Sequence, residues 1–148
     1  MPFTGNFLCT SFKQQLLEGV HDFRTSGTST FKIALYTNAA TFDASTTQYT
    51  TTDEIAPTGS YVAGGGTLTL ISPSSSGTTA FADFADITFT GATITARGAL
   101  IYNATPAHTY TNPAVAVLDF GQDRTVTSND FTVVFPLANA LSALVRIS

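Results

Sequence analysis

A glycine-rich stretch, Glu54-Ile55-Ala56-Pro57-Thr58-Gly59-Ser60-Tyr61-Val62-Ala63-Gly64-Gly65-Gly66, decides how the middle of this chain folds. It combines proline, glycine and serine with a single tyrosine, which is the composition of a tightly shaped turn. It contains neither histidine nor a cluster of metal ligands, so it does not describe a reaction centre. Phe31–Tyr36 before it and Thr67–Ile71 after it have the apolar and β-branched residues of strands. The stretch therefore predicts a shaped turn that leads into a strand.

The composition places the chain among all-β proteins. Its 148 residues favour one domain that is large enough to bury a hydrophobic core. Hydrophobic residues make up 43% of the chain and charged residues only 11%, which is less than half of the usual share. Neutral polar residues, above all threonine, take the place of the missing charge. Threonine and the aromatic residues favour pleated surfaces. Because charge keeps proteins apart in solution, this composition favours a protein that associates with other subunits.

Strand-like segments recur along the chain at intervals of about 8–12 residues. Examples are Phe31–Tyr36, Thr67–Ile71, Ala80–Phe84, Thr93–Tyr102, Phe131–Pro136 and Leu144–Ser148. The prediction is an all-β fold: a jelly-roll-like β-sandwich of about seven or eight strands with one N-terminal helix. We expect an N-terminal arm and helix in residues 1–30 and the sandwich in residues 31–148, together one globular domain.

The helix is predicted from the apolar stripe formed by Phe12, Leu16 and Val20. Thr10 or Ser11 can serve as its N-cap, and the helix should end between positions 22 and 25.

The sequence makes four predictions about individual strands and turns. Ala80–Phe84 is predicted to be a short edge strand, and Gly91 a turn or a bulge. Ala114–Phe120 is an almost continuous apolar run, which predicts a central strand that is buried on both faces. The residues 121–123 should then form a turn.

The segment Thr37–Ser60 is long, polar and rich in threonine, with no clear period. Loops of this length are usually functional or disordered. Tyr49 and Ile55 are its candidate anchors, and we expect the loop to lie across a surface or a partner.

The chain carries few groups that perform chemistry. His21 and His108 lack Cys or His partners at ligand spacing, so we predict no metal site and no cofactor. Asp119-Phe120-Gly121 matches the magnesium tripeptide of protein kinases, but the accompanying kinase motifs are missing. Paired carboxylates at Asp83 with Asp86, or at Asp119 with Asp123, suit caps of turns better than a glycosidase pair. We predict no catalytic residues, and hence that the protein is not an enzyme.

Charge and hydropathy indicate where the protein acts. The net charge is -4 and the basic residues are scattered singly, which argues against a nucleic-acid partner. Residues 1–6 do not read as the start of a signal peptide, and no apolar run is long enough to cross a membrane. We therefore expect synthesis in a cytoplasm, no membrane partner and no ordinary secretion.

Several segments resemble a family of small, β-rich structural proteins of tailed bacteriophages. They are Leu35-Tyr36-Thr37, Ala44-Ser45-Thr46-Thr47, Tyr49-Thr50-Thr51, Glu54-Ile55, Gly59–Gly65, Ala96–Asn103, Ala116–Gly121 and Phe131–Pro136. The resemblance covers most of the chain from about Lys32 onward, and it departs from the family pattern by inserting Ser60 between Gly59 and Tyr61. It implies a component of the virion without enzymatic activity, and it supplies no catalytic residues.

These observations lead to a hypothesis of function. We expect a capsid decoration (cement) protein, made in the host cytoplasm and located in the virion, where it holds the shell together through subunit contacts. Its partners would be the major capsid protein or other virion subunits and further copies of itself, as a dimer or trimer. The candidate contact residues are Phe3, Phe7 and Leu8 in the N-terminal arm, which should be exposed, and Tyr49, Ile55 and Tyr61. The alternatives are a tail, neck or baseplate component, or a carbohydrate-binding module for host attachment.

Overall fold

Two long strands form the spine of the structure, a computed structural model that describes residues 3–148. Strands β6 (Ile87–Asn103) and β7 (Ala114–Val133) pair antiparallel, from Ile87 opposite Val133 to Tyr102 opposite Ala114. The other elements are β1 (Phe7–Leu8), α1 (Thr10–Leu17), β2 (Phe31–Tyr36), β3 (Gly66–Thr67), β4 (Leu70–Ser76), β5 (Thr79–Phe84) and β8 (Val145–Ile147).

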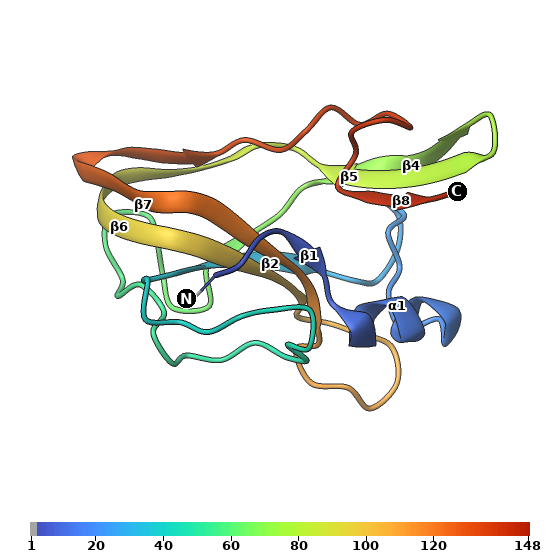
Figure 1. Cartoon of the computed structure of the whole chain (residues 1–148), viewed down its shortest axis with the longest axis horizontal. Helices are drawn as coiled ribbons and strands as arrows, with labels where there is room; N and C mark the ends of the chain where they lie inside the picture. Colours follow the sequence, from blue (N-terminus) through green and yellow to red (C-terminus); the bar gives the residue numbers. More distant parts are fainter. Residues whose placement is uncertain (1–2) are drawn as a thin grey trace.

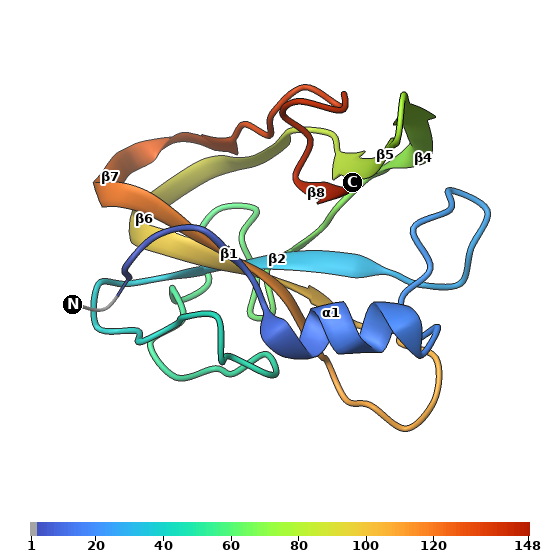
Figure 2. The ribbon, with the colours of Figure 1, turned by 45° about the vertical axis from the view of Figure 1, so that its right-hand side comes forward.

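The strands form two antiparallel sheets. The large sheet has the order β1-β7-β6-β2-β3, and the small sheet has the order β4-β5-β8. Figure 1 and the turned view in Figure 2 show the small sheet above the large one, with α1 and the loop that follows β2 on the opposite side. The predicted all-β sandwich with one N-terminal helix is confirmed.

Strands β6 and β7 bend together where glycines interrupt them. Gly91 and Gly121 have φ angles of 59° and 80°, and the β6–β7 register shifts in both regions. Such bulges bend a strand and increase its twist without ending it. The pair therefore turns at the left of Figure 1 and returns along the top of the molecule. The bulge expected at Gly91 is confirmed, whereas the turn predicted at residues 121–123 is wrong, because these residues are a bulge inside β7.

The small sheet is built around β5. Strand β8 pairs with β5, with Ala80 opposite Ile147 and Ala82 opposite Val145, while β4 pairs with its other side. The prediction that Ala80–Phe84 is an edge strand is therefore wrong. Its second partner comes from the far end of the chain, which local sequence patterns do not reveal.

Aromatic side chains fill the space beside the two sheets. The Phe31 ring of β2 stacks on Phe23 with centroids 4.5 Å apart, and it lies 5.6 Å from the Phe84 ring of β5. Each such side chain contributes roughly 1.5–3 kcal/mol when it is fully buried. In β7 the run from Ala114 to Val117 is buried on both faces, as expected, but residues 118–120 are only half-buried.

The loop after β2 covers the other face of the large sheet. Phe42 lies in this loop, and its ring meets those of Tyr36 and Phe3 edge-on, with centroids 4.6 Å and 5.9 Å away. Phe3 rests on Gly98 of β6, where any side chain would collide with its ring. The loop therefore packs across this chain's own sheet.

Helix α1 is shorter than predicted. Its N-cap is Cys9, not Thr10 or Ser11, and the cap makes no side-chain hydrogen bond. The helix ends at Leu17 because Gly19 adopts a φ of 74°. Gly19 N–H then donates to Leu16 O at 3.2 Å and Val20 N–H donates to Gln15 O at 3.0 Å. These two bonds form a Schellman motif, which satisfies the last carbonyls and stops the helix.

Candidate functional site

The carboxylate of Glu54 holds the glycine-rich stretch in place. It accepts hydrogen bonds from the hydroxyl of Tyr49 at 2.6 Å, from the hydroxyl of Tyr61 at 2.8 Å and from the backbone N–H of Gly64 at 2.7 Å. Hydrogen bonds to a charged acceptor are about twice as strong as neutral ones. One half-buried side chain therefore ties three parts of the loop together.

Further tyrosines connect this loop to the sheet. The hydroxyl of Tyr102 donates to Gly64 O at 2.6 Å, and the Leu35 N–H donates to the hydroxyl of Tyr61 at 2.9 Å. The rings of Tyr49 and Tyr102 stack with centroids 4.6 Å apart. Burial raises the pKa of Tyr102 to about 12 and raises that of Tyr61 further, so both hydroxyls remain hydrogen-bond donors at neutral pH.

Two glycines let the stretch lie directly against neighbouring strands. Gly65 has a φ of 82°, and a side chain there would collide with the carbonyl of Ile33. Gly59 has a φ of 55° and lies against the backbone of Thr90. Ser60 reinforces this contact, since its N–H donates to Thr90 O at 2.9 Å and its Oγ accepts from Thr90 N–H at 2.7 Å. The stretch is a structural turn, as predicted, and it is built into the sheet.

The structure separates the six candidate contact residues into two groups. Phe3, Ile55 and Tyr61 are buried, and the half-buried Tyr49 is engaged by Glu54 and Tyr102. The expectation that Phe3 is exposed is wrong, because its ring fills the space above Gly98. These four residues serve the interior of this chain.

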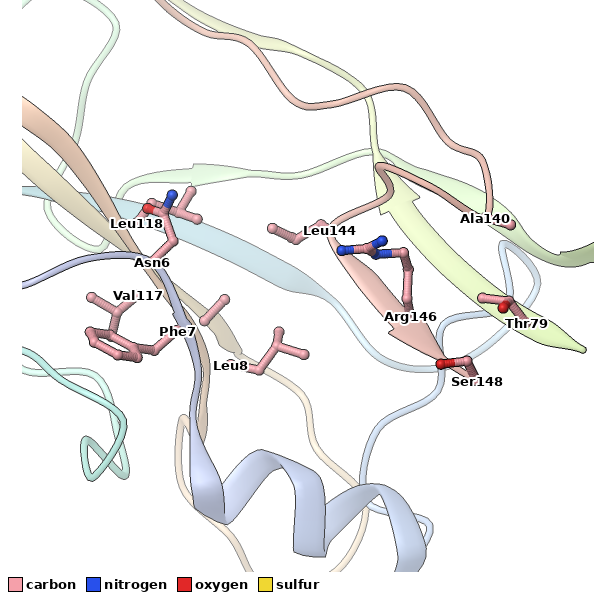
Figure 3. A pocket seen from close by; sticks show the side chains of 11 residues that line it. Asn6, Phe7, Leu8, Thr79, Val117, Leu118, Ala140, Leu144, Arg146 and Ser148 are labelled. Atoms are coloured by element: carbon pink, nitrogen blue, oxygen red, sulfur yellow. The ribbon is translucent and has the colours of Figure 1, made fainter.

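Phe7 and Leu8, the remaining two, are half-buried and line a hollow of about 520 Å³. The hollow lies between β1, an edge strand of the large sheet, and β8, an edge strand of the small sheet. Figure 3 shows Phe7, Leu8, Val117 and Leu118 on one side of it, with Leu144 and Arg146 on the other. The sandwich is therefore open along this side.

A second hollow, of about 540 Å³, follows the edge of β7 further along. Its apolar lining consists of Phe120, Val126, Phe131, Val133 and Val134, and its charged residues are Arg124 and Asp130. The two hollows share no lining residue, but both are lined by residues of β7, and we call the pair of hollows the open-edge groove. Its half-buried apolar side chains are Phe7, Leu8, Leu118, Phe120, Val126 and Leu144. This groove is the candidate contact surface of the chain.

The segment that connects β7 to β8 contributes Val134, Ala140 and Leu144 to the lining of the groove, and it also carries exposed apolar side chains. Val134 is 72% exposed, Leu137 77% and Leu141 86%, all in the segment that connects β7 to β8. Asn139 holds this segment in a turn, because its Oδ1 accepts from the N–H groups of Leu141 and Ser142. Sequence reasoning missed this segment. Its signal is the apolar run that continues past Pro136, where the strand pattern has ended.

The four carboxylates considered as catalytic pairs have structural partners. Asp83 accepts from Phe84 N–H at 2.8 Å, and Asp86 accepts from Phe135 N–H at 2.8 Å. Asp119 lies 3.2 Å from the guanidinium of Arg97, and Asp123 accepts from the side chain of Asn38 at 3.1 Å. The first pair caps backbone N–H groups, as expected.

His21 belongs to a buried polar cluster that the sequence did not indicate. Asn103 Nδ2 can only donate, so His21 Nδ1 accepts from it at 3.1 Å and the proton lies on Nε2, which donates to Gln15 Oε1 at 2.8 Å. Burial lowers the pKa of His21 to about 4, so the ring is neutral at physiological pH. Both ring nitrogens are occupied by structural bonds.

Cys9 is buried, and burial raises its pKa to about 11, which keeps the thiol protonated. Within residues 3–148, no group of three or more His, Cys, Asp or Glu side chains is placed to hold a metal ion. Over the same residues, no helix has the length and apolar character that crossing a membrane requires.

Comparisons with known proteins add no assignment. No protein-family model matches the chain, and no curated protein or solved structure matches it.

Proposed function

We propose that this protein is a non-enzymatic assembly subunit that holds other protein chains together through the open-edge groove. The observation that carries the proposal is the set of half-buried apolar side chains in the groove, together with the exposed Val134, Leu137 and Leu141 in the segment that contributes to its lining. Covering apolar surface contributes about 25 cal/mol per Å². A partner that covers the groove would therefore form a stable complex, and this complex needs no catalytic or ligand-binding centre.

The setting we propose is the shell of a tailed bacteriophage, where the protein acts as a capsid decoration (cement) protein. The sequence resemblance to phage structural proteins and the charged fraction of 11% support this setting. Contacts of about 800 Å² per partner, repeated over many copies, reinforce a shell even when each contact is weak. The partner would be the major capsid protein, with the open-edge groove facing the shell.

The copy number in purified virions tests this proposal. Quantitative mass spectrometry should find the chain in numbers comparable to those of the major capsid protein. A few copies per particle would instead assign it to the tail, neck or baseplate, and absence from the virion would contradict the proposal. Saturable binding on a glycan array, without binding to shells, would favour a host-attachment module.

A further inference from the structure

The outer edge of β7 lacks a strand partner over most of its length. Strand β1 pairs with it only through Phe7 opposite Val117 and Leu8 opposite Ala116. The backbone N–H groups of the next residues along β7 are bound by side chains of this chain. Asn6 Oδ1 accepts from Asp119 N–H, and Asp119 Oδ1 accepts from Gly121 N–H. Beyond Gly121, no described strand in residues 3–148 pairs with this edge. An unpaired edge is a template for a further strand.

The side chains along this edge are arranged symmetrically about Thr127. Arg124 precedes Thr127 by the same number of residues as Asp130 follows it, and Phe120 and Val134 stand in the same relation further out. Arg124 and Asp130 are both exposed and both line the second hollow. The ion pairs within residues 3–148 are Arg24–Asp22 and Arg97–Asp119, so neither charge is paired within the described chain.

Arg124 and Asp130 make only weak contacts of their own. Arg124 Nη2 donates to Phe120 O at 3.3 Å, and Asp130 Oδ1 accepts from Gly91 N–H at 3.4 Å. Both charged groups are therefore available to a partner. A partner that satisfies them must offer an acid to Arg124 and a base to Asp130, with that same spacing along an antiparallel strand. A second copy of this edge does so.

We propose that two copies of this chain form a symmetric dimer, with their β7 edges antiparallel about a two-fold axis at Thr127. In this arrangement Arg124 faces Asp130 of the second copy, and Asp130 faces its Arg124. A two-fold contact requires this kind of self-complementary surface. The inference rests on the proposed function and names a second copy as the partner at the β7 end of the groove, which leaves the β1–β8 end for the shell.

Ser128 interrupts the edge next to the proposed axis. Its φ is 47°, and the β6–β7 register shifts near it. In the dimer, the β7 strands of the two copies therefore pair on both sides of the two-fold axis but not at the axis itself. Bulges and charges also protect edge strands from association. If Ser128, Arg124 and Asp130 only protect the edge from association, the chain is a monomer. If the edge pairs with a second copy, the chain is a dimer, so the oligomeric state distinguishes the two roles.

Charge reversal provides the test. Arg124→Asp places two acids opposite each other at both ends of the contact, and Asp130→Arg places two bases there. Each variant alone should weaken dimerisation about a hundredfold or more, because facing like charges are strongly unfavourable. An equimolar mixture of the two variants should form a heterodimer, since every facing pair is then again opposite in charge.

Sedimentation velocity of the folded proteins is the measurement, with far-UV circular dichroism to confirm folding. Lys13→Asp, which reverses an exposed charge on α1, is the matched control and should dimerise like the unmodified chain. The dimer should also weaken at high salt.

A chain that stays monomeric at about 100 μM, where even weak specific pairs form, would overturn the inference. A dimer that Arg124→Asp leaves intact, or two variants that do not combine, would also overturn it. If the chain stays monomeric but occurs in virions in numbers like those of the major capsid protein, the dimer is wrong and the proposed function still stands. A low copy number with an intact dimer would contradict the function and leave the dimer standing.

Discussion

The covered face of the large sheet and the open-edge groove use similar residue types in opposite ways. On the covered face, Glu54 and the tyrosines around it bond to each other and to the backbone, and Phe3 and Phe42 are enclosed. Along the groove, Phe7, Phe120 and Leu144 remain half-buried with no layer above them. The first region is enclosed within one chain, whereas the second leaves its apolar side chains half-buried and is the contact surface that we propose. Changes on the covered face should therefore damage folding, and changes along the groove should damage association.

The largest effect is expected at Gly65 on the covered face. Gly65→Ala would place a methyl group against the carbonyl of Ile33, so the loop and β2 would have to separate. We expect a loss of about 4 kcal/mol or more in the free energy of unfolding, measured by urea denaturation. Gly77→Ala is the matched control: its φ of 59° is similar, nothing lies near its added methyl group, and it should lose only about 1 kcal/mol. Equal losses would show that the close approach of the loop is unimportant.

Removing the Glu54 carboxylate should have the next largest effect. Glu54→Ala leaves two tyrosine hydroxyls and the Gly64 N–H without their acceptor, which should lower the free energy of unfolding by about 3 kcal/mol. Glu18→Ala also removes a carboxylate that accepts from a tyrosine, here Tyr110, but on the exposed surface. The control should change stability little in the same denaturation series. A Glu54 variant as stable as the control would contradict the account of the covered face.

The buried His21 cluster predicts a smaller effect that depends on pH. His21 has a pKa of about 4 in the folded chain and about 6.5 when unfolded, so only the unfolded chain binds its proton between these values. Its stabilisation is fully present above pH 6.5 and declines as the pH falls to about 4, by up to roughly 3 kcal/mol. Urea denaturation at a series of pH values measures this slope. His21→Gln should flatten the slope between pH 6.5 and 4, and an unchanged slope would assign it to other groups.

Most of the fold could be predicted from local patterns, because the apolar runs at β2 and at the start of β7 mark strands wherever they occur. Three features could not. Gly91 and Gly121 read as possible strand ends, but pairing between β6 and β7 carries both strands through the bulges. The central place of β5 depends on β8, which is distant in the sequence. The burial of Phe3 depends on the missing side chain of Gly98.

The candidate site was predicted only in part. Phe7 and Leu8 were identified because the N-terminal arm is apolar and precedes the helix. Phe120 and Leu144 belong to strand-like segments, so their patterns predicted a core position. They are only half-buried because the two sheets do not close over them, and that depends on how the whole sandwich is assembled.

The most direct test of the account compares two exposed leucines. Leu141 is 86% exposed and adjoins the groove, because it follows Ala140 of the lining and its carbonyl accepts from the lining residue Arg146. Leu17 is 92% exposed on α1, away from the residues that line the groove. Leu141→Asp and Leu17→Asp should each change the free energy of unfolding by less than about 0.5 kcal/mol, because neither side chain is buried. Co-sedimentation with virus shells that lack the protein is the measurement. We expect the Leu17 variant to bind like the unmodified chain and the Leu141 variant to lose binding; equal binding by both variants would contradict the claim that the open-edge groove is the contact surface.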